Sequence, residues 1–144
     1  MVTKDVNMST DKCIDSSMAI KTLISTGDSI RSQYELVVQE WLPDDPPITI
    51  AFSTIGHGVC EYAPVASELD LARIGEVIEN LFLSGEVEVK NAVATGLVEA
   101  ILGEASAGRF DMSLISKHLG PETRAYCREW DEFTGCLTNG VASD

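Results

Sequence analysis

The sequence has few basic residues and no long apolar run. Lys and Arg number 10 against 23 Asp and Glu, so the formal net charge is −13. Nucleic acid and anionic membrane surfaces are also negatively charged, so we expect the chain to bind neither. No apolar run approaches the roughly 20 residues of a membrane-spanning helix. The N-terminus, MVTKDVNMSTDK, also lacks the apolar segment of a signal peptide, so we expect a cytoplasmic protein.

Closely spaced cysteines and catalytic motifs are also absent. Cys13, Cys60, Cys127 and Cys136 lie far apart, with no CxxC pair, and a reducing cytoplasm would keep them as free thiols. The sequence contains no phosphate-binding loop, no GxSxG and no HExxH. These absences lead us to expect no cofactor, no bound metal and a protein that is not an enzyme.

Histidine and cysteine supply one alternative to that expectation. His57 and Cys60 are three residues apart, a spacing that places two metal ligands on one face of a helix. His118 and Cys127 flank a Gly-Pro turn and could complete the set. The same residues could form a Cys/His nucleophilic pair. The alternative is therefore a small enzyme or a metal-binding protein, although zinc ligands are usually paired more closely.

Residues 67–104 form the stretch around which the rest of the chain is organised. Apolar residues recur at helical spacing on both sides of Ser84-Gly85, which predicts two helices folded back on each other. Ser67 can cap the first helix, and Gly85 can end it in the left-handed conformation. The two apolar stripes are Leu71, Ile74, Val77, Ile78, Leu81 and Phe82, followed by Val89, Val93, Leu97, Ala100 and Ile101.

The remaining segments also favour helices separated by Gly and Pro. Residues 48–63 begin with the β-branched ITIAF, but their apolar residues repeat every three or four positions, so we predict a helix capped by Thr49. The other expected helices are 13–25, 28–42 with a cap at Asp28 or Ser29 and Trp41 inward, 112–119 capped by Asp111, and 122–133 with Trp130 and Phe133 inward.

The predicted fold is therefore all-α, with six or seven short helices arranged as antiparallel hairpins. Either a bundle or a stack of helix pairs like HEAT repeats would satisfy this pattern. We expect a flexible N-terminal tail at 1–11, a single helical domain at 12–135 and a polar C-terminal tail at 136–144.

Acidic residues are the candidate partner-binding residues. Helical periodicity places most of them in solvent, where they could simply be a hydrated surface or could meet a basic protein. A catalytic acid pair would need a cleft, and the sequence indicates none. The candidates are Asp44, Asp45, Glu76, Glu79, Glu129, Asp131 and Glu132.

Three blocks, ITIAFSTIGHGVCEY, EVKNAVATGLVEAI and LGPETRAYCREWDEFTG, resemble a family of small all-helical bacterial proteins to which no activity is attached. The resemblance covers about residues 47–135 and leaves the first forty or so residues outside it. Members of that family look like proteins encoded beside polymorphic toxins. The resemblance therefore implies an immunity protein, which would bind and neutralise a basic toxin domain. A general protein-interaction module is a further alternative.

Overall fold

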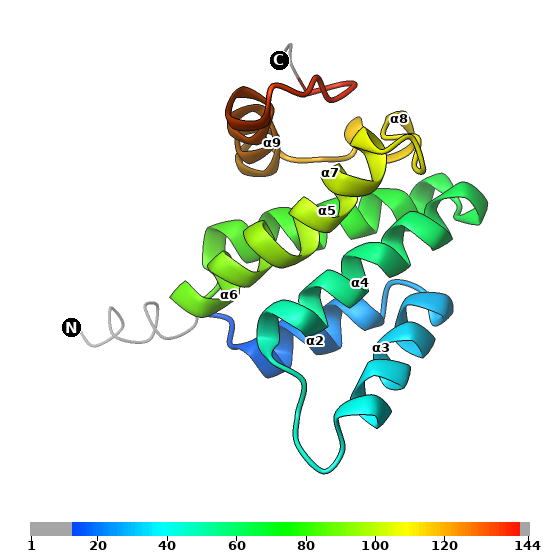
Figure 1. Cartoon of the computed structure of the whole chain (residues 1–144), viewed down its shortest axis with the longest axis vertical. Coiled ribbons are helices and arrows are strands. Elements are labelled where there is room, and N and C mark those ends of the chain that lie inside the picture. Colours follow the sequence, from blue (N-terminus) through cyan, green and yellow to red (C-terminus); the bar gives the residue numbers. More distant parts are fainter. Residues whose placement is uncertain (1–12, 142–144) are drawn as a thin grey trace, which may run out of the picture.

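The computed structural model describes residues 13–141, which form helices joined by short turns (Figure 1). In chain order they are α2 (Ser16–Ile24), α3 (Asp28–Trp41), α4 (Ile48–Tyr62), the 3₁₀ turn η1 (Ala63–Val65), α5 (Glu68–Ser84), α6 (Val87–Ala92), the π-helical η2 (Val93–Val98), α7 (Glu99–Ser106), α8 (Ser113–Ser116) and α9 (Pro121–Thr134). The all-α prediction is confirmed, and residues 13–141 contain seven helices when α6, η2 and α7 count as one. The tail expected at 1–11 lies outside the described residues.

Helix α4 lies at the centre of the arrangement. It packs against α3 on one side and against η2 and α7 on the other (Figure 1). Helices α3 and α4 form one antiparallel hairpin, and α5 with the α6–η2–α7 helix forms the other. Helix α9 packs on α5. The turn between α3 and α4 (the α3–α4 turn, residues 42–47) and α9 lie at opposite ends of the long axis.

The predicted apolar stripes form the core. Ile74, Ile78 and Leu97 are 0% exposed, and Leu81 is 1% exposed. Phe52 and Ile55 of α4 are also fully buried, so the segment that begins with ITIAF is a helix, as its periodicity predicts. Of the predicted stripes, Val77, Phe82 and Ala100 are only half-buried. Among residues 13–141, no helix has the length and apolar character needed to cross a membrane.

Helix ends follow the sequence in part. The Ser67 hydroxyl accepts a hydrogen bond from the Asp70 N–H at 3.1 Å, which confirms the predicted cap. Gly85, however, has φ −74° and is not left-handed. A Cβ there would lie 2.7 Å from both the Leu81 carbonyl oxygen and a Val89 methyl, so close packing explains the glycine. The predicted cap at Thr49 is also wrong, because α4 starts directly after Pro47.

Two more caps differ from the predictions. Gly27 occupies the N-cap position of α3, so neither Asp28 nor Ser29 is the cap. The helix expected at 112–119 is only the short α8, and its N-cap position is Met112 and not the predicted Asp111. The Asp111 carboxylate accepts hydrogen bonds from the Ser113 N–H and hydroxyl instead.

Two aromatic residues expected in the core are exposed. Trp41 is 38% exposed at the end of α3, and Phe133 is 90% exposed at the end of α9. By contrast, Trp130 is partly buried against the core. Residues 136–141 fold back along α9, because the Arg128 guanidinium donates to the Val141 carbonyl and Val141 is fully buried. The described part of the expected C-terminal tail therefore packs on the domain.

Candidate functional site

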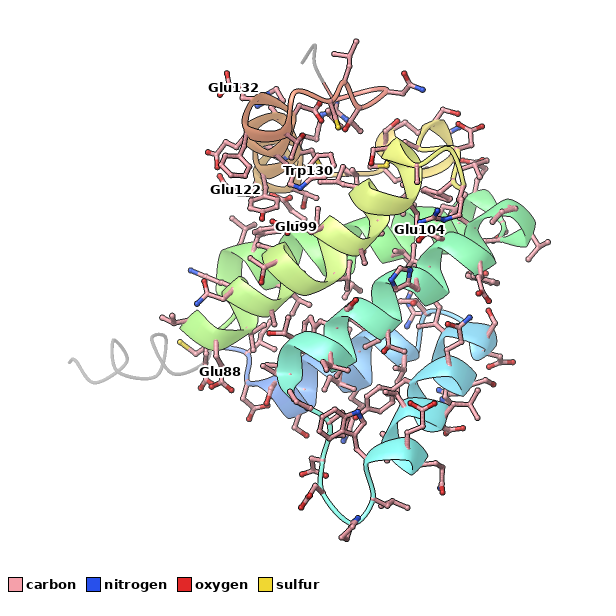
Figure 2. All side chains as sticks on the ribbon, viewed as in Figure 1. Glu88, Glu99, Glu104, Glu122, Trp130 and Glu132 are labelled. Carbon is pink, nitrogen blue, oxygen red and sulfur yellow. The ribbon has the colours of Figure 1, made fainter. Side chains whose placement is uncertain are left out.

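The predicted partner-binding acids lie in three separate places. Asp44 and Asp45 are in the α3–α4 turn, Glu76 and Glu79 are on α5, and the rest are on α9. Since the α3–α4 turn and α9 are at opposite ends of the molecule, the acids do not form one patch (Figure 1). Other acids are equally dispersed: Glu122 lies at the start of α9, and Glu88 lies at the start of α6 (Figure 2).

Glu79 has a structural partner, which the sequence does not predict. Its carboxylate accepts hydrogen bonds from the Glu122 N–H at 3.0 Å, the Thr123 N–H at 3.0 Å and the Thr123 hydroxyl at 2.8 Å. These N–H groups belong to the first turn of α9, where no residue of the same helix can accept them. Glu79 therefore caps α9 from α5, and its negative charge is favourable at the positive end of the helix dipole.

Asp131 also binds within the chain. Its carboxylate accepts the Thr138 N–H at 2.9 Å and the Thr138 hydroxyl at 2.6 Å, which holds the C-terminal segment on α9. Glu79 and Asp131 are thus half-buried structural residues and not outward acids. Among residues 13–141, the carboxylates without an ion pair or side-chain hydrogen bond include the other candidates, Asp44, Asp45, Glu76, Glu129 and Glu132.

We expect Glu79→Ala to destabilise the fold by about 1 kcal/mol, the usual cost of losing a helix cap. The first turn of α9 loses three hydrogen bonds in this variant. Glu76→Ala is the matched control, because Glu76 is on the same helix and is exposed, so its effect should stay within about 0.5 kcal/mol. Denaturant unfolding measures both, and equal stabilities would show that Glu79 does not cap α9.

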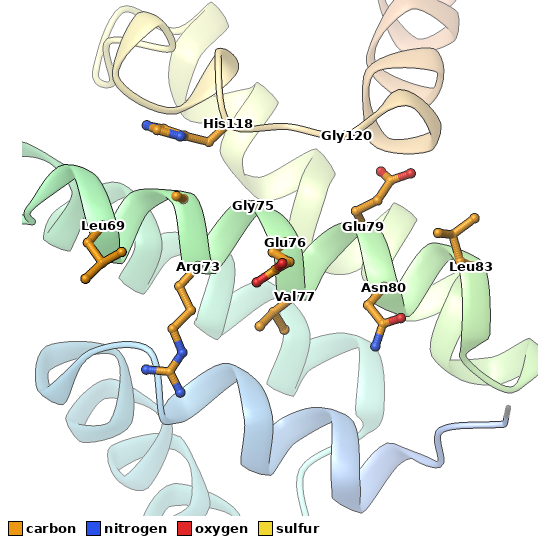
Figure 3. A pocket seen from close by; sticks show the side chains of 11 residues that line it. Leu69, Arg73, Gly75, Glu76, Val77, Glu79, Asn80, Leu83, His118 and Gly120 are labelled. Atoms are coloured by element: carbon orange, nitrogen blue, oxygen red, sulfur yellow. The ribbon is translucent and has the colours of Figure 1, made fainter. Parts of the chain in front are cut away.

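A groove of about 830 Å³ runs along the outer side of α5, between α2 and the link that joins α8 to α9 (Figure 3). Leu69 and Leu83 line it and are 78% and 59% exposed. Its charges are mixed, because Arg73 lines it together with Glu76 and Glu79. The Arg73 guanidinium also donates a hydrogen bond to the Ser25 hydroxyl at 3.3 Å. The Glu79 carboxylate accepts a hydrogen bond from the first turn of α9. The groove is consequently not an acidic site.

His118 lies at the edge of this groove and is bound to Glu68. Its Nε2 is 2.9 Å from Glu68 Oε1, and the Lys117 ammonium is 3.3 Å from the same oxygen. The hydrogen bond from His118, followed by that from Lys117, lowers the pKa of the Glu68 carboxyl below its usual value. His118 thus links the segment before α9 to the start of α5.

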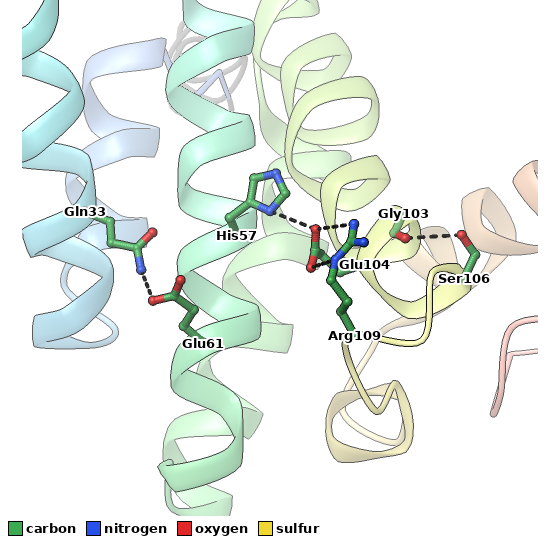
Figure 4. A network of polar contacts seen from close by, with 7 residues as sticks. All are labelled: Gln33, His57, Glu61, Gly103, Glu104, Ser106 and Arg109. Atoms are coloured by element: carbon green, nitrogen blue, oxygen red, sulfur yellow. Dashed lines mark hydrogen bonds and ion pairs between the residues drawn. The ribbon is translucent and has the colours of Figure 1, made fainter.

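His57 belongs to a different cluster, between α4 and α7 (Figure 4). Its Nδ1 is 3.5 Å from Glu104 Oε2, and Arg109 Nε is 3.0 Å from Glu104 Oε1. The hydrogen bond from Arg109 is the main cause that lowers the pKa of Glu104. Glu104 joins α4, α7 and the following loop, and the sequence analysis did not single it out. An acid five residues before an arginine was the only local signal.

The two cysteines of the predicted metal or nucleophile set are protonated at neutral pH. Burial raises the pKa of Cys60 to about 12, and the nearby Glu104 and Glu61 add to this. Burial, with a contribution from Asp131, also raises the pKa of Cys127 to about 12. A thiolate is the form that attacks substrates or binds zinc, so these sites do not favour either chemistry.

The predicted ligands also have separate partners. His57 contacts Glu104, whereas His118 contacts Glu68. Within residues 13–141, no three His, Cys, Asp or Glu side chains are grouped in a way that could hold a metal ion. The structure thus does not bring His57, Cys60, His118 and Cys127 together as one such group.

Comparison with known proteins places the chain in a family. The family described as a domain of unknown function, DUF7674, matches residues 20–135. The chain belongs to this family. The match starts well before residue 47, so most of α2 and all of α3, which the sequence resemblance left outside, are part of the DUF7674 domain. No curated protein and no solved structure matched the chain in the same comparisons.

Proposed function

We propose that this DUF7674 protein is an immunity protein that binds a basic toxin domain and covers its active site or substrate groove. The observation that carries this proposal is the net charge of −13, together with surface acids that lack partners within the described residues. Carboxylates without a local cation raise the rate of encounter with a positively charged protein. The toxin part of the proposal rests on the resemblance of the sequence blocks to proteins encoded beside toxins.

The alternatives have less support. Protonated thiols and separated histidines give little basis for a small enzyme or a metal-binding protein that uses His57, Cys60, His118 and Cys127. About one zinc per purified chain in elemental analysis would favour the metal-binding alternative. A general interaction module would share the acidic surface but would bind a protein that is not toxic.

Co-expression tests the proposal directly. The toxin domain encoded beside the gene for this chain is produced alone, with the parent chain, and with an unrelated acidic helical protein of similar size. We expect growth to be restored only by the parent chain, and a one-to-one complex to be isolated. A toxin that remains lethal and does not bind the chain would refute the immunity proposal.

A further inference from the structure

The α3–α4 turn borders a pocket to which the predicted partner-binding residues contribute only Asp45. The pocket has a volume of about 390 Å³ and lies between the start of α2, the middle of α3 and the start of α4. Its lining includes Ser16, Ser17, Tyr34, Asp45 and Ile48, and none of the residues that line it is basic. We call it the turn pocket. Its volume is in the range of small-ligand pockets, about 300–1,000 Å³.

The backbone around the turn pocket is well defined by local bonds. The Asp44 N–H donates to the Trp41 carbonyl at 2.8 Å, and the Ala51 N–H donates to the Pro47 carbonyl at 2.9 Å. Pro46 and Pro47 follow Asp45 directly, and a proline ring fixes the φ angle of its residue. A turn backbone held in this way loses little conformational entropy when a partner binds at Asp45.

The lining has the chemistry of a receptor for a basic side chain. Asp45 supplies a negative charge, and Tyr34 supplies an aromatic ring and a hydroxyl. The apolar wall, which includes Ile48, suits the methylene stem of a Lys or Arg, whose charged end can then reach the carboxylate and the ring. Within residues 13–141, neither the Tyr34 hydroxyl nor the Asp45 carboxylate has a hydrogen bond or an ion pair.

Exposed apolar residues lie in the α3–α4 turn and at the helix ends that it joins. Trp41 is seven residues after Tyr34 on α3 and is 38% exposed, and Leu42 in the turn is 57% exposed. Ile50, in the first turn of α4, is 40% exposed. Tryptophan and apolar anchors beside a charged group are typical of the residues that carry most of the binding energy in protein interfaces.

We propose that the turn pocket receives a Lys or Arg side chain of a basic protein partner, with Trp41 and Leu42 packed beside it. This inference rests on the proposed function, because it names the surface with which the chain would meet its basic partner. The α5 groove is larger, but its mixed charges fit a basic partner less well. On α9, Phe133 is exposed near Glu129 and Glu132, but it lines neither the α5 groove nor the turn pocket.

The test uses the isotope-labelled full chain and a small probe, N-acetyl-arginine methylamide, followed by nuclear magnetic resonance. The neutral isostere N-acetyl-citrulline methylamide is the control probe. We expect the arginine probe to shift the amide signals of Ser16, Ser17, Tyr34 and Asp45 at millimolar concentration. Asp45→Asn should weaken this binding at least tenfold, whereas the neighbouring Asp44→Asn should weaken it less than threefold.

Three results would overturn the inference: equal shifts with the citrulline probe, shifts spread over α9 as strongly as over the turn pocket, or equal losses in the two variants. Binding of the neighbouring toxin separates this inference from the proposed function. If the toxin binds and Asp45→Asn has the same Kd as Asp44→Asn, the pocket is refuted and the immunity proposal stands. If the arginine probe binds as expected and the toxin does not, the immunity proposal fails and the pocket stands.

Discussion

Gly96→Leu is expected to destabilise the fold by about 1–3 kcal/mol, the usual cost of adding volume to a packed interior. A Cβ at Gly96 would lie 2.9 Å from the Thr49 carbonyl oxygen and 3.1 Å from the Phe52 Cβ. Both atoms belong to α4, and Phe52 is fully buried, so neither has space to move away. The new side chain must therefore push η2 away from α4 and open the core between the two hairpins.

The contact has a counterpart on the other helix. A Cβ at Gly56 of α4 would lie 2.5 Å from the Leu97 carbonyl oxygen, so the two helices approach each other through a glycine on each side. The matched control for Gly96→Leu is Gly103→Leu, since nothing lies within 4 Å of a Cβ at Gly103 on the same continuous helix. Both substitutions gain similar helix propensity, so their difference in unfolding free energy isolates the contact.

Thermal and denaturant unfolding measure that difference. We expect Gly103→Leu to be as stable as the parent or up to about 1 kcal/mol more stable, because leucine favours helix over glycine. If Gly96→Leu melts together with Gly103→Leu, then η2 does not press against α4 through Gly96, and the described packing is wrong at its centre.

Periodicity explains why so much of the fold could be predicted. Ile74, Ile78 and Leu81 are buried because a 3.6-residue repeat puts them on one side of α5, whatever packs against it. The glycines Gly56 and Gly96 are unfavourable inside a helix, and a glycine at such a position is a signal of close helix contact that the sequence itself carries. Apolar spacing and a glycine inside a helix can both be recognised from a few neighbouring residues of one sequence.

The unpredicted features depend on residues far apart in the sequence. Glu79 looked like an outward acid because its partner, Thr123, lies 44 residues away. One signal was available: α9 begins with Gly-Pro and has no Ser, Thr, Asp or Asn at the N-cap, so an acceptor had to come from elsewhere. The π-helical η2 gave no signal, because one extra residue per turn barely changes an apolar pattern this dense.

The sequence predicted the residue type of the candidate site, which is acidic, but not which acids would be available to a partner. The charge count identified the acids as candidate partner-binding residues. Which of their carboxylates lack hydrogen-bond partners depends on how the helices pack. Asp131 and Glu79 are occupied by hydrogen bonds, whereas Asp44 and Asp45 remain exposed. The sequence did not indicate that Tyr34 lines a pocket either. Tyr34 lies on the apolar face of α3, and only the returning α3–α4 turn brings Asp45 to the same pocket.

Reversing the charges of the α3–α4 turn, Asp44→Lys with Asp45→Lys, is expected to lower the association rate constant with the neighbouring toxin by about tenfold or more at low salt. Complementary charge raises association rates by about 10 to 1,000-fold, and reversal replaces attraction with repulsion at the point of contact. Both side chains are exposed and neither has an ion pair within the described residues, so the fold should survive, which circular dichroism and the melting temperature can verify.

The matched control is Glu86→Lys with Glu88→Lys. It changes the formal charge by the same amount at two exposed residues at the start of α6, which neither proposal assigns to the partner. A third variant, Glu129→Lys with Glu132→Lys, tests the opposite end of the molecule. We expect only the α3–α4 turn variant to lose most of its association rate, while the other two lose the smaller part that comes from net charge.

The salt dependence of the rate constants separates long-range electrostatic steering from direct contacts in the complex. The Debye length falls from about 10 Å at 0.1 M to about 3 Å at 1 M, so the association rates of parent and variants should converge as salt rises. A faster dissociation rate of the α3–α4 turn variant should persist at 1 M, because a Lys in place of Asp45 removes a contact partner as well as a long-range charge. If all three variants associate equally slowly, the association rate depends only on net charge. If the association rate changes neither with salt nor with any charge reversal, the proposed function loses its electrostatic basis.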